Sequence, residues 1–260
     1  MRLEVVYMTH KGLQKYTTNQ DTLLIDGKIV ANCSMVEALL IERELNNNKV
    51  LLALSDGMGS TPHAEVASKR VLELLWQFTQ EQTPFLPIKS IRKIQDTMEN
   101  MAIVSPEYRG MGATLAGIYI EEMKLTLFNI GDSRIYRLRE SKLTQRSKDH
   151  TQAQKMLDSG EITQEEFENL SSVYHMLEGY LVAGELDEEE ILIEVKKEIP
   201  QAGDMWLLCS DGIHDLFSDE EIAELLNQGN SLTKKCQGLF DAVYRVAEDN
   251  LSLILIAFKE

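Results

Sequence analysis

Short runs of apolar and β-branched residues recur along the chain and predict a protein rich in β-structure. Each run is four to eight residues long and is followed by polar or glycine-containing turns, as is typical of strands in a sheet. We predict strands at residues 4–9, 22–25, 50–55, 115–120, 125–130, 135–138, 205–210 and 251–258.

Two other stretches carry apolar residues at helical spacing. Residues 64–78 and 88–98 have this pattern, which predicts two amphipathic helices separated by prolines. A second helical pair is predicted near the C-terminal end, with one helix beginning at Ser218 as its cap and one over residues 231–247. Strands and helices are therefore mixed along the chain.

The remaining segments are harder to assign from the pattern. Residues 29–33 favour a strand, whereas residues 36–45 fit a strand or a helix equally well. Residues 151–180 are polar, acidic and interrupted by glycine, and we interpret them as an insertion beside the core. Without repeats or a long linker, residues 1–260 are predicted to form one α+β domain with mainly antiparallel strands.

Charge and composition exclude several classes of protein. The 260 residues include 26 Lys and Arg against 42 Asp and Glu, a formal net charge of −16, which disfavours a nucleic-acid partner or an anionic lipid surface. No apolar run approaches the roughly 20 residues of a membrane-spanning helix, and no signal-peptide core is present. Three scattered cysteines suit a reducing compartment, so we expect a cytoplasmic protein without membrane insertion.

A carboxylate stands at the end of several apolar strands, and this pattern carries the functional prediction. Asp56, Asp132 and Asp211 each follow a predicted strand, while Asp21 and Asp249 each precede one. If these ends converge, five carboxylates share a small space, and their mutual repulsion requires neutralising cations. Ligand sets made only of oxygen favour Mg²⁺ or Mn²⁺, and a pair of such ions forms a hydrolytic centre.

A simpler interpretation exists for each of these sites alone. Asp followed by Gly after an apolar run is also a common hairpin signal, so a single site of this kind is more often a turn. The recurrence of the pattern at several strand ends favours the metal interpretation.

Seven motifs in order resemble those of the metal-dependent serine/threonine protein phosphatases of the phosphatase 2C type, in their bacterial form. The resemblance extends from about residue 5 to residue 258. The motifs are Asn19-Gln20-Asp21, Ser55-Asp56-Gly57-Met58-Gly59, Gly110-Met111-Gly112-Ala113-Thr114-Leu115, Ile130-Gly131-Asp132-Ser133-Arg134-Ile135-Tyr136, Asp149-His150-Thr151, Ser210-Asp211-Gly212-Ile213-His214-Asp215 and Glu248-Asp249-Asn250.

The resemblance implies an α-β-β-α sandwich, with two antiparallel sheets, a helical pair on each outer face and a metal cleft at one edge. It implies that Asp56 bridges two metal ions and that the carbonyl of Gly57 contacts one of them. Asp211 and Asp249 would each hold one ion of the pair, and Asp21 would act through metal-bound water. The sequence leaves open whether Asp249 or its neighbour Glu248 is the ligand.

Further roles follow from the same resemblance. Asp132 and Asp215 match the positions that bind a third, weaker metal ion in bacterial members, although Asp215 could instead cap its helix locally. Residues 147–184 resemble the family's flap, which lies beside the cleft and affects substrate access. The implied reaction is hydrolysis of phosphoserine and phosphothreonine by a metal-activated water, on substrates phosphorylated by a partner serine/threonine kinase.

The sequence departs from the family pattern at the expected phosphate-binding position. Members usually have Arg five residues before the first metal-site Asp, and this chain has Tyr16 there. Lys15 or Lys11 could supply the missing charge, or the Tyr16 hydroxyl could bind a phosphate oxygen. Gln20 replaces a usual Glu, which removes one negative charge. We expect weaker phosphate binding, seen as a raised KM.

Three alternatives to a general phosphatase can be compared with the sequence. A cysteine-based phosphatase needs Arg six residues after the nucleophile, and none of the three cysteines has it. A pseudophosphatase that only binds a partner is motivated by Tyr16 and Gln20, but a scaffold has no need for repelling carboxylates. A phosphatase dedicated to one small signalling protein is the third alternative, although such relatives usually lack the flap.

Overall fold

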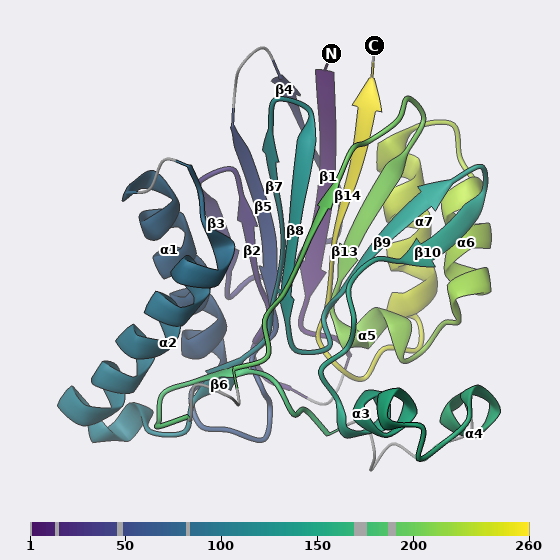
Figure 1. Cartoon of the computed structure of the whole chain (residues 1–260). Helices are drawn as coiled ribbons and strands as arrows, with labels where there is room; N and C mark the ends of the chain where they lie inside the picture. Colours follow the sequence, from purple (N-terminus) through teal and green to yellow (C-terminus); the bar gives the residue numbers. More distant parts are fainter. Residues whose placement is uncertain are drawn as a thin grey trace.

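Two six-stranded antiparallel sheets form the centre of the structure, a computed structural model that describes residues 2–13, 16–45, 49–81, 84–168, 176–186 and 191–259. Helices cover the outer face of each sheet, so the layers run helix, sheet, sheet, helix (Figure 1). The predicted α-β-β-α sandwich is therefore confirmed.

The first sheet has the order β10-β9-β13-β14-β1-β4, and every neighbouring pair is antiparallel. The neighbouring strands β14 and β1 bring the two ends of the described chain together, because Arg2 of β1 pairs with Lys259 of β14. The strands are β1 (Arg2–His10), β4 (Leu39–Glu44), β9 (Arg134–Arg139), β10 (Lys142–Gln145), β13 (Met205–Cys209) and β14 (Leu251–Lys259).

The second sheet has the order β12-β8-β7-β5-β2-β3, again antiparallel throughout. A separate two-stranded ribbon of β6 (Gly112–Ala113) and β11 (Leu181–Val182) lies at one end of it. The six strands are β2 (Thr22–Ile25), β3 (Lys28–Ala31), β5 (Val50–Ser55), β7 (Leu115–Glu121), β8 (Lys124–Ile130) and β12 (Glu194–Glu198).

Helices α1 and α2 pack on the second sheet, and α6 and α7 pack on the first (Figure 1). The short helices α3 and α4 lie beyond one end of the sandwich, together with α5. The helices are α1 (Ala64–Glu81), α2 (Pro87–Val104), a 3-10 turn (Pro106–Tyr108), α3 (Gln152–Ser159), α4 (Gln164–Glu168), α5 (Asp211–His214), α6 (Asp219–Asn227) and α7 (Leu232–Tyr244).

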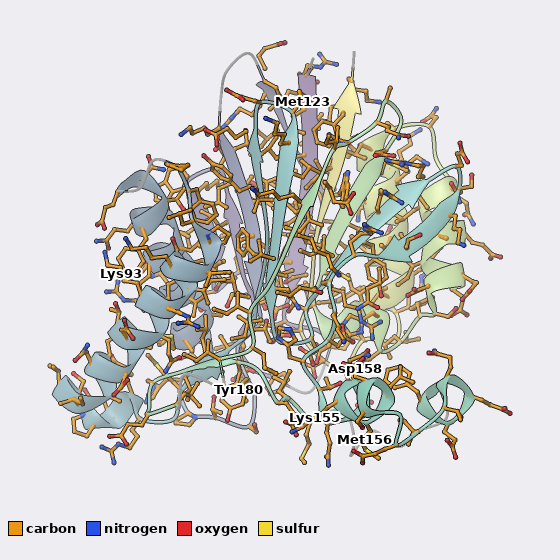
Figure 2. The ribbon with its side chains drawn as sticks, viewed as in Figure 1. Lys93, Met123, Lys155, Met156, Asp158 and Tyr180 are labelled. Carbon is orange, nitrogen blue, oxygen red and sulfur yellow. The ribbon has the colours of Figure 1, made fainter. Side chains whose placement is uncertain are left out.

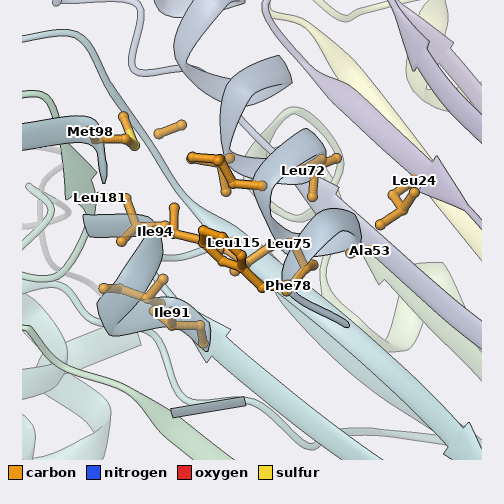
Figure 3. Packing of buried hydrophobic residues seen from close by; sticks show 14 of the residues in the cluster. Leu24, Ala53, Leu72, Leu75, Phe78, Ile91, Ile94, Met98, Leu115 and Leu181 are labelled. Atoms are coloured by element: carbon orange, nitrogen blue, oxygen red, sulfur yellow. The ribbon is translucent and has the colours of Figure 1, made fainter. Parts of the chain in front are cut away.

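Central strands are buried on both faces, and this explains why they read as continuous apolar runs. Leu23 of β2 packs between the two sheets, whereas its neighbour Leu24 packs in the layer between the second sheet and α1 (Figure 3). Val5 and Val6 of β1 divide in the same way between the inner layer and α7. Each fully buried side chain of this size contributes roughly 1.5–3 kcal/mol to folding.

The predicted cap at Ser218 is confirmed, and Ser231, the predicted start of the second helix, caps α7. The backbone N–H of Glu221 donates to Ser218 Oγ, and the Glu221 carboxylate accepts from the Ser218 N–H, which makes a capping box. Ser231 Oγ accepts from the N–H of Lys234 at the start of α7. The predicted helix to residue 247 is three residues too long, because α7 ends at Tyr244.

Several strands differ from the prediction. The ambiguous residues 36–45 contain strand β4 rather than a helix. Strands β10 and β12 were not predicted, because they are polar and β12 has no fully buried residue. Both lie at the edge of a sheet, where charged side chains are tolerated and hide the strand pattern.

None of the helices in the described part of the chain is both long and apolar enough to cross a bilayer.

Candidate metal centre

The end of β5 places Asp56 in a fixed orientation. All six residues of β5 are buried, and Ser55 Oγ donates to the carbonyl of Thr114 at 2.6 Å. The N–H of Asp56 donates to Thr114 Oγ1 at 3.1 Å, and the N–H of Thr114 donates back to the Asp56 carbonyl at 2.8 Å. A side chain at Gly57 would overlap the carbonyl of Ala64, so only glycine fits after this aspartate.

Asp211 stands where β13 passes into α5. It is the first residue of α5, and Ser210, its N-cap, ends the buried strand. A Cβ at Gly212 would overlap the carbonyl of Asn250, so this glycine lets the α5 turn approach the start of β14. Asp211 is thereby held close to the segment that carries Asp249.

Asp21 lies behind these residues at the start of β2 and is fully buried. Its Oδ2 accepts a hydrogen bond from Ser210 Oγ at 3.0 Å. Its Oδ1 is buried without a hydrogen-bond partner. A buried carboxylate oxygen without a donor is costly, and a cation or a cation-bound water would satisfy it.

Asp132 follows β8 through Gly131, whose φ of 108° suits only glycine. His214 Nε2 lies 3.1 Å from the Asp132 carbonyl oxygen, which ties this turn to α5. The N–H of Gly131 donates to His150 Nδ1 at 3.2 Å, so His150 supports the turn that carries Asp132.

A cavity of about 470 Å³ opens over these loops. It receives Asp56 and Asp132 from the second sheet and Asp211 and Asp249 from the first, so both sheets contribute to its wall. The lining consists of Tyr16, Asp56, Gly57, Met58, Gly59, Ser60, Thr114, Asp132, Met176, Leu177, Tyr180, Asp211 and Asp249.

The carboxylates are close enough to perturb one another. Burial raises the pKa of Asp21 to about 7, and the neighbouring Asp211 charge adds to the rise. Burial also raises the pKa of Asp56 and Asp132 well above the ordinary value, and Asp211 contributes in both cases. The pKa of Asp211 is raised by burial, with a contribution from Asp215 that His214 opposes. The site therefore favours binding of protons or cations.

The donor set fits hard divalent cations. Among the described residues that line the cavity there is no Lys, Arg or His to balance the four aspartates. No three acidic, His or Cys side chains of the described ranges are arranged to hold one ion by themselves. An open carboxylate cavity of this kind suits Mg²⁺ or Mn²⁺, because such ions retain several waters as ligands.

Some of the remaining predicted site residues line the cavity and others do not. Asp249 lines the cavity, whereas its exposed neighbour Glu248 does not. Asp215 does not line it either, since it caps α5 with a side chain 57% exposed, 3.3 Å from His214 Nδ1. Tyr16 lines the cavity beside Gly59, and Lys15 lies outside the described residues.

Sequence reasoning missed residues that hold the cavity's aspartates in place. Thr114 fixes Asp56 through two hydrogen bonds, and Asn250 joins the Asp249 segment to the chain before Asp21. Thr114 and Asn250 both lie inside motifs noted in the sequence. Their place in these motifs is the only sequence signal for their role.

Comparison with known proteins identifies the class of protein that has this fold and this aspartate-lined cavity. The family model of protein phosphatase 2C matches residues 39–251, most of the chain. The chain belongs to this family, as the sequence motifs predicted.

Individual relatives agree with this assignment. Over 183 residues the chain is 38% identical to serine/threonine protein phosphatase PstP of Mycobacterium tuberculosis, a match that covers 68% of this chain and 34% of PstP. The match therefore spans about a third of the length of that relative. Serine/threonine phosphatase stp of Listeria monocytogenes is 27% identical over 222 residues, covering 82% of this chain and 86% of stp.

A solved structure gives the same picture for the fold. The catalytic domain of PstP, crystallised in complex with two manganese ions, superposes with a TM-score of 0.73 at 29% identity. The superposition covers 99% of both chains.

Proposed function

We propose that this chain hydrolyses phosphoserine and phosphothreonine on proteins, with two divalent cations, Mn²⁺ or Mg²⁺, as cofactors. The observation that carries the proposal is the convergence of Asp56, Asp132, Asp211 and Asp249 on one cavity whose described lining has no basic side chain. Membership of the phosphatase 2C family and the two manganese ions in the PstP structure support it.

Each aspartate has a proposed part in holding the cations. Asp56, the Gly57 carbonyl, Asp211 and Asp249 would bind the pair, and Asp21 would act from behind through its unpaired Oδ1. When bound, such cations make water a competent nucleophile near neutral pH and offset charge on the phosphoryl group.

A third, weaker ion would involve Asp132 and Asp215. Asp132 lines the cavity, and the charge of Asp215 helps to raise the pKa of Asp132, after the larger effects of burial, Asp211 and Asp149. The exposure of Asp215 suits a weakly held ion that keeps most of its water.

The chain's own residues would bind and orient the substrate phosphate. Tyr16 is a wall residue beside Gly59, and its hydroxyl is a donor that adds no charge. Tyr16 therefore takes the place of a cationic phosphate ligand in this proposal, and Lys15, the next residue back along the chain, stays an alternative. A neutral donor binds phosphate less strongly than a guanidinium, so KM rises.

The biological setting completes the proposal. A serine/threonine kinase must supply the phosphorylated substrate, because the reaction consumes a phosphomonoester on a protein. The reduced, scattered cysteines support a cytoplasmic location.

Phosphate release from a phosphothreonine peptide in Mn²⁺ tests the proposed reaction. We expect activity that both EDTA and Asp211→Asn abolish, because each removes the cations from the cavity. A folded wild-type protein that releases no phosphate from the peptide or from p-nitrophenyl phosphate at millimolar Mn²⁺ would overturn the proposal. The chain would then be a pseudophosphatase that binds a partner, the alternative suggested by Tyr16 and Gln20.

A further inference from the structure

A second cavity of about 790 Å³ lies beside the metal centre. Its wall is formed by the segment before β12, the residues on both sides of β11, and α3 with the turn that precedes it. Figure 2 shows Tyr180, which lines this cavity, at the same end of the molecule as Lys155 and Asp158 of α3.

This second cavity borders the first. Leu177 and Tyr180 line both the second cavity and the aspartate-lined cavity. A polypeptide whose phosphorylated side chain reaches the aspartates therefore lies close to the second cavity, with these two residues between the two sites. A small phosphoester does not extend that far.

The charged groups on the rim are already neutralised. Lys155 Nζ lies 2.7 Å from Glu178 Oε2, and Lys148 forms an ion pair with Asp158. Asp149 is held by the guanidinium of Arg134 at 2.6 Å. These pairs leave little unbalanced charge with which to select an acidic or a basic substrate residue.

Aliphatic side chains form one part of this wall. They are Leu177, Leu186, Leu192 and Ile193, and Leu192 is 40% exposed. Exposed leucine in a concave wall favours an apolar ligand, because both surfaces leave water on contact.

We propose that this second cavity binds an apolar side chain of the substrate polypeptide near its phosphorylated residue, and so selects phosphoproteins by sequence. The inference rests on the proposed phosphatase activity. Leu192 is the specificity-determining residue, because it is the most exposed apolar side chain of the wall.

A series of phosphothreonine peptides tests the proposal. The peptides differ only in having leucine or serine at one position, scanned from one to five residues on either side of the phosphothreonine. For the wild-type holoenzyme in Mn²⁺ we expect one position at which leucine raises kcat/KM about tenfold over serine, the effect of filling an apolar pocket.

Variants link that preference to the cavity. Leu192→Ser should abolish the leucine preference, whereas Leu192→Met should retain most of it. Leu86→Ser is the matched control, because Leu86 is similarly exposed at 49% but lies at the N-terminal end of α2. All three variants should hydrolyse p-nitrophenyl phosphate at the wild-type rate, since this substrate does not reach the second cavity.

The outcomes separate this inference from the proposed function. Wild-type protein that hydrolyses p-nitrophenyl phosphate and all peptides without preference would overturn the inference and leave the phosphatase activity standing. A leucine preference that persists in folded Leu192→Ser would also overturn it. Wild-type protein that hydrolyses neither substrate would overturn both. The wild-type peptide series decides the matter even if a variant fails to fold.

Discussion

The side-chain carbonyl oxygen of Asn250 accepts a hydrogen bond from the backbone N–H of Gln20 at 2.7 Å. The amide nitrogen of the same side chain donates to the carbonyl of Lys11 at 2.9 Å. Asn250 thus joins the start of β14, next to Asp249, to the chain that leads to Asp21. Because it is 2% exposed, water cannot replace these bonds without rearrangement.

Replacing Asn250 should weaken metal binding. Asn250→Ala leaves two backbone groups unpaired, so we expect a loss of roughly 1–3 kcal/mol in the free energy of unfolding. We also expect Mn²⁺ affinity to fall about 10- to 100-fold, as when a group that supports a metal ligand is removed. Titration calorimetry measures the affinity. Asn227→Ala is the control, because that side chain makes an exposed bond to the Ser141 carbonyl. An unchanged Mn²⁺ affinity in Asn250→Ala would show that the hydrogen bonds of Asn250 do not position Asp21 and Asp249.

Gly212→Ala should damage both the fold and the activity. The added Cβ overlaps the Asn250 carbonyl and must displace either α5 with Asp211 or the segment with Asp249. Overpacking of this kind costs about 1–3 kcal/mol. Gly238→Ala is a matched control in α7, where a Cβ meets nothing within 4 Å and should stabilise the helix by roughly 0.5–1 kcal/mol. Urea denaturation measures the stability of both variants, and phosphate release measures their activity. If the two variants had equal stability and activity, the predicted overlap at Gly212 would be refuted.

Tyr16 should control KM more than kcat. We expect Tyr16→Phe to raise KM for a phosphopeptide, because it removes the hydroxyl donor from the wall. Tyr16→Arg should lower KM, because a guanidinium binds phosphate bidentately. Steady-state kinetics separate the two constants. If Tyr16→Arg left KM unchanged, Tyr16 would not contact the phosphate.

Acid should destabilise the protein partly through Asp204, which precedes β13 at the opposite end of that strand from Asp211. Burial alone would raise the pKa of Asp204. Two nitrogens of Arg139 each donate to its carboxylate at 2.7 Å, and the Gln201 N–H donates as well. These hydrogen bonds outweigh burial, so the pKa of Asp204 is lowered. A lowered folded-state pKa contributes stability above the ordinary value of 3.8, and this contribution is lost as pH falls through the lower folded value. Urea unfolding between pH 3 and 6 should therefore show a smaller pH dependence for Asp204→Asn. An identical slope for the two proteins would contradict this role.

Mn²⁺ should stabilise the protein more at pH 8 than at pH 6. Protons and cations compete for the same carboxylates, and the pKa of Asp21, raised by burial to about 7, places that competition between these two values. Thermal unfolding with Mn²⁺ or EDTA measures the shift in Tm, which follows ligand binding to the folded state. Asp211→Asn should reduce the shift at both pH values. A Tm that Mn²⁺ does not change at pH 8 would exclude tight binding in the cavity.

The sequence predicted the layers well because the central strands are buried on both faces. Residues such as Leu23 and Leu24 must both be apolar, which makes these strands continuous apolar runs. The same pattern marked where each strand ends, and so where Asp56, Asp132 and Asp211 stand. Edge strand β12 carries no such mark, because four of its five residues are Glu or Lys and none of the five is fully buried.

Contacts that join distant parts of the chain were beyond the sequence. The hydrogen bond from Asn250 to Lys11 joins residues 239 positions apart. Its acceptor is a backbone carbonyl, which every residue has, so the side chain at position 11 gives no sign of the bond. The second cavity likewise depends on how the segment before β12 approaches Leu177.

The pairing of β1 with β14 sets an order of events during synthesis. Asp249 precedes β14, and β14 pairs along its whole length with β1, which lies at the other end of the described chain. A nascent chain on the ribosome can display Asp21, Asp56 and Asp132 while β14 is still untranslated. The proposed cation site, to which Asp249 belongs, is therefore complete only after β14 leaves the exit tunnel and inserts between β1 and β13.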